Sequence, residues 1–193
     1  HRRNDVGVSR IPHAQESELV AMVIAGDRRA FTNLVEPHLP RLLATSLRMV
    51  GIREEAEDAV QNALASAWIA RARLDPRRPV LPILTTITLN KCRDKLRRRK
   101  AAQFLGFGKA SSFEIVADET PSPEVEASDR QSLHAAYAEI QKLPLRMREA
   151  LILVAIDGRS QKEAAVLLGI TEKAVEGLVY RARNTLRKKL DVA

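Results

Sequence analysis

The sequence predicts an all-α fold made of two small helical domains joined by a flexible acidic linker. Apolar residues recur at three- and four-residue steps over most of the 193 residues, and no convincing alternating strand pattern is present. Glycine, serine and proline gather after Lys100, and every charged residue from 111 to 129 is acidic. Such a polar, proline-bearing stretch buries too little surface to fold alone. The expected boundaries are a tail over 1–13, a domain over 14–100, the linker over 101–128 and a second domain over 129–193.

Turn and cap residues divide the first part of the chain into short helices. Gly26 and Gly51 are expected to end the first and third helices, and Asp27 is expected to cap the second. Pro37 and Pro40 break or kink the path between the second and third helices.

Two longer helices follow in the first domain. One is expected over residues 53–73, with small and apolar residues on one face and acidic and amide residues on the other. A loop over residues 75–82, rich in proline and arginine, separates it from a helix over about 83–100. That second helix ends in a cationic cluster with a single acid, Asp94. The cations are Lys91, Arg93, Lys95, Arg97, Arg98, Arg99 and Lys100. A helix C-terminus accommodates one or two cations through its dipole, so this larger number indicates a phosphate-binding surface.

The second domain contains a short helix, a glycine turn and a longer basic helix. Ser160 and Glu163 have the spacing of a capping box, Gly169 suits a left-handed turn, and Thr171 is expected to cap the longer helix. The expected buried stripe of that helix is Val175, Leu178, Ala182 and Leu186. Its outward positions are Lys173, Glu176, Gly177, Tyr180, Arg181 and Arg183, followed by Arg187, Lys188 and Lys189. This order predicts a helix-turn-helix whose second helix enters the major groove of DNA, and the alternative is a helical hairpin with a solvated basic face.

Composition narrows the class of partner. The formal net charge of +8 and the pI of about 10.1 favour a polyanion, either nucleic acid or an acidic membrane surface. No apolar run approaches the roughly 20 residues that span a bilayer, so no membrane insertion is expected. Cys92 is the only cysteine, which fits a reducing cytoplasm, and the four histidines are scattered, so no metal and no cofactor are expected.

Three stretches together resemble the sigma-70 family of bacterial transcription initiation factors, in its extracytoplasmic-function (ECF) subgroup. Residues 57–64 with Trp68 look like the helix that docks on the clamp of core RNA polymerase. Residues 87–99 look like the helix that reads and melts the minus-ten element. Leu143-Pro144, Arg148-Glu149 and residues 160–187 look like the domain that reads the minus-thirty-five element. The resemblance implies a sigma-two-like domain followed by a sigma-four-like domain.

The resemblance also assigns expected roles to individual residues. Contacts to the minus-ten element are expected from Arg77, Arg78, Asn90, Lys91, Asp94, Arg97 and Arg98. Contacts to the minus-thirty-five element are expected from Thr171, Lys173, Glu176, Gly177, Tyr180, Arg181 and Arg183. Contacts to the polymerase are expected from Glu57, Asp58, Gln61 and Asn62. The implied partners are core RNA polymerase, promoter DNA and an anti-sigma factor, with no small-molecule substrate. The acidic linker is expected to follow the polymerase's basic channel, or else to be a plain tether.

The sequence departs from the family pattern at two places. Ile83 stands where the family usually has a tryptophan before the minus-ten helix, which implies altered packing. Glu176, Gly177 and Leu178 stand where many members carry a basic residue, a serine and an arginine. Glu176 either accepts a hydrogen bond from a cytosine amine or is a solvated carboxylate.

Rival functions follow from the same features. One is a sigma-like decoy that sequesters an anti-sigma factor without binding DNA. Such a decoy has no need of the cationic cluster. A simple helix-turn-helix repressor leaves the clamp-like segment unexplained. An enzyme is least favoured, because the sequence offers no nucleophile–base pair, metal cluster or phosphate loop.

Overall fold

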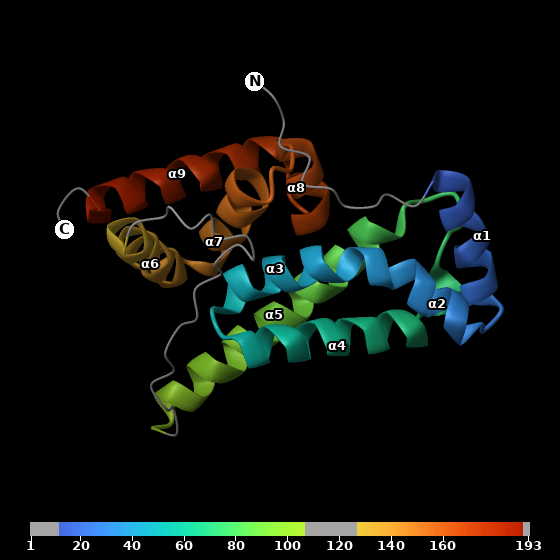
Figure 1. Ribbon diagram of the computed structural model, residues 1–193. Helices are drawn as coiled ribbons and strands as arrows, with labels where there is room; N and C mark the ends of the chain where they lie inside the picture. The colour runs from blue at the N-terminus through green and yellow to red at the C-terminus, as the bar shows by residue number, and fades with distance from the viewer. Residues whose placement is uncertain (1–11, 107–126, 191–193) are drawn as a thin grey trace.

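The computed structural model describes residues 12–106 and 127–190, which form helices joined by short turns and contain no strand. The predicted all-α class is therefore confirmed for this part of the chain (Figure 1). Most of the predicted tail and linker, residues 1–11 and 107–126, lies outside the described residues.

The first three helices are placed by the predicted turn residues. Helix α1 (His13–Ile24) ends before Gly26, which adopts φ 97°, and α2 (Arg28–Val35) begins after Asp27. The Asp27 carboxylate caps α2 by accepting the first free N–H groups, from Arg29 and Ala30, at 2.8 and 3.0 Å. A 3-10 turn, η1 (Glu36–His38), leads into α3 (Leu39–Val50), which ends at Gly51 with φ 77°. The two prolines lie in the first turns of η1 and α3, where a backbone N–H needs no partner.

The two long helices differ from their predicted bounds. Helix α4 (Arg53–Ile69) stops before a separate 3-10 turn, η2 (Arg71–Arg73), so the prediction of one helix over 53–73 was wrong at its end. Helix α5 (Val80–Phe104) is longer than predicted at both ends. Pro82 lies inside α5 rather than in the preceding loop, because the first turn of a helix tolerates the missing N–H. The 25 residues of α5 extend over about 37 Å, and its C-terminal end projects away from the other helices (Figure 1).

The second part of the chain is a compact group of helices. It comprises α6 (Ala127–Lys142), α7 (Leu145–Leu151), a π-helical turn η3 (Ile152–Ile156), α8 (Gln161–Leu168) and α9 (Glu172–Leu190). The wide turn of η3 is closed by a hydrogen bond of 2.8 Å from the N–H of Asp157 to the carbonyl of Ile152. The apolar run predicted to form a core helix, residues 150–156, covers the end of α7 and η3, and its first four residues are buried.

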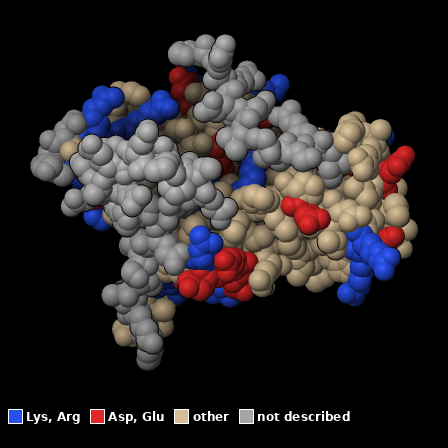
Figure 2. Space-filling model, in the orientation of Figure 1, with Lys and Arg blue, Asp and Glu red and all other residues tan. Residues whose placement is uncertain are grey.

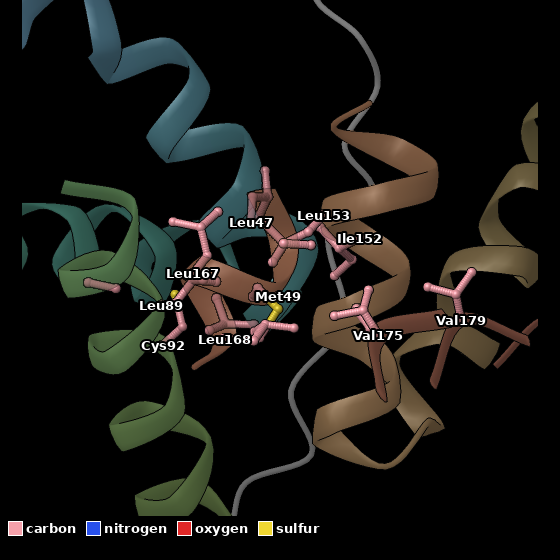
Figure 3. Close-up of a cluster of buried hydrophobic side chains, with 14 of the residues drawn as sticks. Leu47, Met49, Leu89, Cys92, Ile152, Leu153, Leu167, Leu168, Val175 and Val179 are labelled. Carbon is pink, nitrogen blue, oxygen red and sulfur yellow. The ribbon is translucent and has the colours of Figure 1, made fainter. Parts of the chain in front are cut away.

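The helices of both sequence halves share one hydrophobic cluster. Figure 1 shows the group α6–α9 lying across α3 and α5, while α4 covers the opposite side of α5. In Figure 3, Met49 of α3 and Cys92 of α5 meet Leu153 of η3 and Leu168 of α8. A second cluster joins α1–α5, and a third joins α6, α7 and α9. The two predicted domains therefore pack against each other through a buried apolar interface.

Candidate nucleic-acid interface

Local backbone bonds fix the geometry of the helix-turn-helix. Ser160 and Glu163 form the predicted capping box: Ser160 N–H donates to Glu163 Oε2 at 2.8 Å, and Glu163 N–H donates to Ser160 Oγ at 3.1 Å. The backbone N–H of Ser160 is the larger cause that holds the pKa of Glu163 below its ordinary value, and the Ser160 hydroxyl, which donates to Glu163 Oε2 at 2.8 Å, is the next. Gly169 turns the chain with φ 64°, and Thr171 Oγ1 accepts from Ala174 N–H at 3.2 Å. All three predicted capping and turn roles are confirmed.

The second helix of this motif, α9, presents a polar face to solvent. Thr171, Lys173, Glu176, Tyr180, Arg181 and Arg183 are exposed, whereas Gly177 is half-buried. Lys and Arg side chains project along α9 in Figure 2. On the opposite face the buried residues are Val175, Val179 and Ala182. Of the predicted stripe, Val175 and Ala182 are buried, whereas Leu178 and Leu186 are half-buried and pack against the apolar clusters. Val179, which was not predicted, lies deeper than either leucine.

Helix α5 separates the predicted minus-ten residues onto two faces. Successive residues differ by about 100° around a helix, so Asn90, Asp94 and Arg97 share one face and Lys91 and Arg98 share another. The first face borders a cavity of about 350 Å³ between α5 and α7. Its lining residues are Asn90, Arg93, Asp94, Arg97, Leu145 and Arg146. The two faces of α5 therefore present different groups.

A carboxylate organises the loop before α5. Asp75 accepts from the backbone N–H and the side chain of Arg77, at 3.0 and 3.1 Å, and lies 3.7 Å from Arg78. The Arg77 hydrogen bonds hold the pKa of Asp75 below its ordinary value. Both arginine side chains remain largely exposed, so they are available to a phosphate. Arg97 lies 17 residues after the start of α5, or about 25 Å farther along the helix axis.

The predicted polymerase-binding residues form one surface on α4. Glu57, Gln61 and Asn62 are exposed, and Asp58 is half-buried. Asn62 Nδ2 donates to the Asp58 carboxylate at 3.0 Å, and Lys95 of α5 forms an ion pair with the same carboxylate. The hydrogen bond from Lys95 is the main reason that the pKa of Asp58 is lowered. This acidic-amide surface is therefore continuous with the Lys91 and Arg98 face of α5.

Three of the predicted cations in α5 hold the fold together. Arg93 pairs with Glu149, Lys95 with Asp58, and Arg99 with Glu55 at 3.1 Å. These three cations are therefore paired within the fold, and none of them is among the residues expected to contact the minus-ten element. Local sequence offered no signal for these pairs, because their partners lie on other helices.

Charged residues whose buried contacts the sequence reasoning did not predict lie where α3 and α5 meet the second half. Arg148 donates to the carbonyl of Met49 at 2.9 Å, and burial is the main cause that lowers its pKa to about 10, so it stays charged at neutral pH. Asp157 accepts from Thr45 at 2.7 Å and from Arg48 at 3.0 Å. The only sequence signal for these buried charges was their position directly before and after the apolar run 150–156, at residues 148–149 and 157.

Other kinds of site find no support in the described part of the chain. Within residues 12–106 and 127–190, no group of three or more His, Cys, Asp or Glu side chains is placed to hold a metal ion. None of the helices in those ranges is both long and apolar enough to cross a membrane.

Comparison with known proteins identifies two matching family models. The model described as sigma-70 region 2 matches residues 34–102, and the model described as sigma-70, region 4 matches residues 133–186. The first range covers α3, α4 and most of α5, and the second covers α7, α8 and most of α9.

Relatives match over nearly the full length of the chain. RNA polymerase sigma factor CnrH of Cupriavidus metallidurans is 40% identical over 185 residues, which cover 93% of this chain and 96% of CnrH. ECF RNA polymerase sigma factor SigM of Mycobacterium tuberculosis strain H37Rv is 31% identical over 175 residues, covering 91% of this chain and 84% of SigM.

Two solved structures have the same architecture. The structure of CnrH in complex with the cytosolic domain of CnrY aligns with a TM-score of 0.68 and 32% identity, covering 92% of this chain and 98% of that one. The sigma factor RpoE from Bartonella quintana, in complex with the anti-sigma factor NepR, aligns with a TM-score of 0.67 and 26% identity. That alignment covers 84% of this chain and 97% of RpoE.

Proposed function

This chain belongs to the sigma-70 family of RNA polymerase sigma factors, in its extracytoplasmic-function group, and on that premise we propose how its surfaces are used. Residues 14–100 act as the polymerase-binding and minus-ten domain, and residues 129–193 act as the minus-thirty-five domain. The polymerase performs nucleotidyl transfer, and this chain supplies binding and promoter recognition without a catalytic step of its own. It works in the cytoplasm, where the polymerase and the chromosome are.

The α4 surface is the proposed polymerase contact. Glu57, Gln61 and Asn62 are exposed, and Asp58 is kept ionised by Lys95. Such a surface suits a basic, hydrogen-bonding partner. Its position beside α5 keeps the polymerase close to the helix that is assigned to the minus-ten strand.

The minus-ten strand is assigned to the loop after η2 and to α5. Arg77 and Arg78 begin this path, and Arg97 and Arg98 end it. The path is long enough for several nucleotides, and cations spaced along it track the backbone while bases are held between them. Asn90 and Asp94 supply hydrogen-bonding groups on the face that borders the α5–α7 cavity.

The observation that carries this proposal is the outward face of α9. A complete helix-turn-helix leaves Lys173, Glu176, Tyr180 and Arg181 exposed, while Val175 on the other face is buried. In such motifs, side chains near the start of the second helix reach base edges and later basic residues contact phosphates. We assign base reading to Lys173 and Glu176 and phosphate binding to Arg181 and the residues beyond it.

An anti-sigma factor is the proposed regulator. The aligned RpoE was solved with the anti-sigma factor NepR, and the aligned CnrH with the cytosolic domain of CnrY. The similar fold supports a partner of the same kind for this chain.

Transcription by a reconstituted polymerase tests the proposal. Core RNA polymerase, with or without the chain, is given linear templates that carry randomised DNA upstream of a fixed reporter, and the run-off transcripts are sequenced. We expect transcripts only with the chain, and templates that converge on two separated motifs. A chain that neither binds core polymerase nor supports transcription would falsify the proposal, and a chain that binds only an anti-sigma protein would favour the decoy function.

Matched variants assign each surface. Asp58→Lys is expected to abolish core binding, and Glu176→Gln to alter only the upstream motif. Arg97→Gln with Arg98→Gln is expected to weaken promoter binding and to reduce the slope of log K against log salt by about 0.7–0.9 for each lost phosphate contact. Glu139→Gln, which breaks only an ion pair within α6, is the control and is expected to behave as the unaltered chain.

A further inference from the structure

Two arginines from distant parts of the sequence lie against the chain's single tryptophan. The guanidinium carbon of Arg28, in the first turn of α2, lies 5.5 Å from the centre of the Trp68 ring. That of Arg71, in η2, lies 4.5 Å from the same point, and Phe31 packs against the ring in a T-shaped arrangement. Because both distances end on one ring, the two guanidinium carbons are at most about 10 Å apart. The fold therefore brings two cations together at the end of α4.

Further arginines adjoin this pair, and none of them has an acidic partner. Arg29 follows Arg28 in α2, and Arg73 lies at the end of η2. We call the four residues Arg28, Arg29, Arg71 and Arg73 the arginine patch. In the part of the chain that the structure describes, no acidic side chain forms an ion pair with any of them. Lys and Arg side chains gather at the lower right of Figure 2, where α2 and the end of α4 lie in Figure 1. Such like charges repel each other, and a bound anion offsets that repulsion.

The local contacts hold Arg71 in place before any ligand binds. Its Nη1 donates to the carbonyl oxygen of Trp68 at 3.2 Å, and its Nε is buried without a hydrogen-bond partner among the described residues. The cation–π attraction to Trp68 holds a guanidinium without using its hydrogen-bond donors. A side chain that is already fixed loses little conformational entropy on binding, and a guanidinium matches the geometry of a phosphate. The arginine patch therefore suits the regularly spaced phosphates of a nucleic-acid backbone.

The arginine patch adjoins the loop that is assigned to the minus-ten strand. Helix η2 leads directly into the loop that carries Arg77 and Arg78. Helix α1 is tied to the start of α5, because Val80 N–H donates to the Glu16 carboxylate at 2.7 Å. In Figure 1, α1 and α2 lie at the opposite end of the first half from the projecting end of α5. The patch therefore continues the path of the strand beyond the start of α5.

We propose that the arginine patch binds the phosphate backbone of the unpaired strand between the minus-ten motif and the transcription start. This inference rests on the proposed function, because it continues the strand path assigned to the loop and α5. The polymerase copies an unpaired template at the start, so the opposite strand on that side of the motif is also single-stranded. Spaced cations follow the backbone of such a strand, and phosphate contacts carry no base preference. The patch thus stabilises the melted promoter complex without choosing the promoter.

Neutral backbone links test individual phosphates. The chain with core RNA polymerase binds a template that carries the two motifs from the run-off selection and is unpaired from the minus-ten motif to the start. Methylphosphonate links, which carry no charge, replace one phosphate at a time along the strand that contains the minus-ten motif. The affinity for each template is measured by competition at several salt concentrations. The variants are Arg28→Gln, Arg71→Gln and Arg71→Lys. The control is Lys142→Gln, which removes an exposed cation that pairs with Glu139 within α6.

The expected result is a loss that depends on a particular phosphate. Arg28→Gln is expected to bind the unmodified template roughly tenfold more weakly at low salt, the effect of losing a hydrogen bond to a charged group. Its slope of log K against log salt is expected to fall by about 0.7. When the contacted phosphate is already neutral, the same substitution is expected to change nothing, because the contact is absent in both chains.

The other variants give the remaining comparisons. Arg71→Gln is expected to show the same pattern at a neighbouring phosphate. Arg71→Lys keeps the charge and is expected to keep the salt slope, although it loses the paired N–H bonds. Lys142→Gln is expected to match the unaltered chain on every template. If Arg71→Gln does not fold, the exposed Arg28 and the phosphate scan with the unaltered chain still decide the question.

Three results overturn the inference and leave the proposed function standing. One is an Arg28→Gln chain that binds every template as the unaltered chain does. Another is a weakening that is equal on all the methylphosphonate templates, because that indicates an effect on the fold. The third is a phosphate scan in which no neutral link between the motif and the start weakens binding. An unaltered chain that fails to bind the unmodified template together with core polymerase contradicts the proposed function itself.

Discussion

Replacing Gly177 by alanine is expected to stabilise the chain. Gly177 lies inside α9, it does not have a positive φ, and a Cβ built there meets no atom within 4 Å. Glycine inside a helix costs about 0.5–1 kcal/mol relative to alanine. With no clash to offset that gain, Gly177→Ala is expected to raise the free energy of unfolding by about 0.5–1 kcal/mol. For a chain of this size that corresponds to a rise in Tm of about 1–4 °C.

A second glycine in the same motif is the matched control. Gly169 ends α8 with φ 64°, and a Cβ there also meets no atom within 4 Å. Its backbone conformation is nevertheless unfavourable for alanine, so Gly169→Ala is expected to lower stability by about 1 kcal/mol. Thermal and urea unfolding followed by circular dichroism measure both variants. A Gly177→Ala chain that is no more stable, or a Gly169→Ala chain that is not destabilised, refutes this account of the backbone.

Transcription directed by the Gly177→Ala chain is expected to fall, although the stability of the chain rises. Gly177 lies beside Glu176 on the face of α9 that is proposed to read the minus-thirty-five element, so DNA docked there is expected to approach its backbone closely. The added methyl group is then expected to reduce run-off transcription while the protein becomes more stable. Unchanged transcription would show that Gly177 does not lie at the contact with the minus-thirty-five element.

Three other substitutions or conditions test the packing. Leu153→Ala removes a fully buried side chain from the shared cluster and is expected to cost about 2–5 kcal/mol in urea unfolding; a loss below 1 kcal/mol contradicts the shared core. Ser160→Ala removes the capping box of α8 and is expected to cost about 0.5–2 kcal/mol, whereas Ser160→Asp keeps most of the cap. Burial is the main cause that raises the pKa of Cys92 from 9.0 to about 11, so the folded chain keeps a neutral thiol that iodoacetamide alkylates slowly at pH 8.5 until urea is added. Because the Cys92 thiol ionises at lower pH in the unfolded chain than in the folded chain, it is expected to lower the free energy of unfolding as the pH rises from about 9 to 11. Fast alkylation of Cys92 without urea would contradict its burial.

The sequence by itself determined the local structure. Gly26, Asp27 and Gly51 set the ends of the first helices, and Ser160 with Gly169 set the helix-turn-helix. These signals are readable because a cap, a left-handed turn and an apolar face each depend on residues only a few positions apart. The helix ends at 69, 80 and 104 were missed, since apolar and charged periodicity changes gradually there and Pro82 fits a first turn as well as a loop.

Only the tertiary structure decided which charges hold the fold and which face solvent. Arg93 and Arg97 look alike in the sequence, yet Arg93 meets Glu149, 56 residues away, while Arg97 pairs with nearby Asp94 and stays exposed. Arg48 and Asp157 meet across 109 residues. Such pairs depend on how α3 and α5 pack against α7 and η3, and that packing follows from the burial of apolar side chains over the whole chain. Whether a cation of α5 forms a buried ion pair or belongs to the exposed cationic face is therefore decided only by the packing of the two halves.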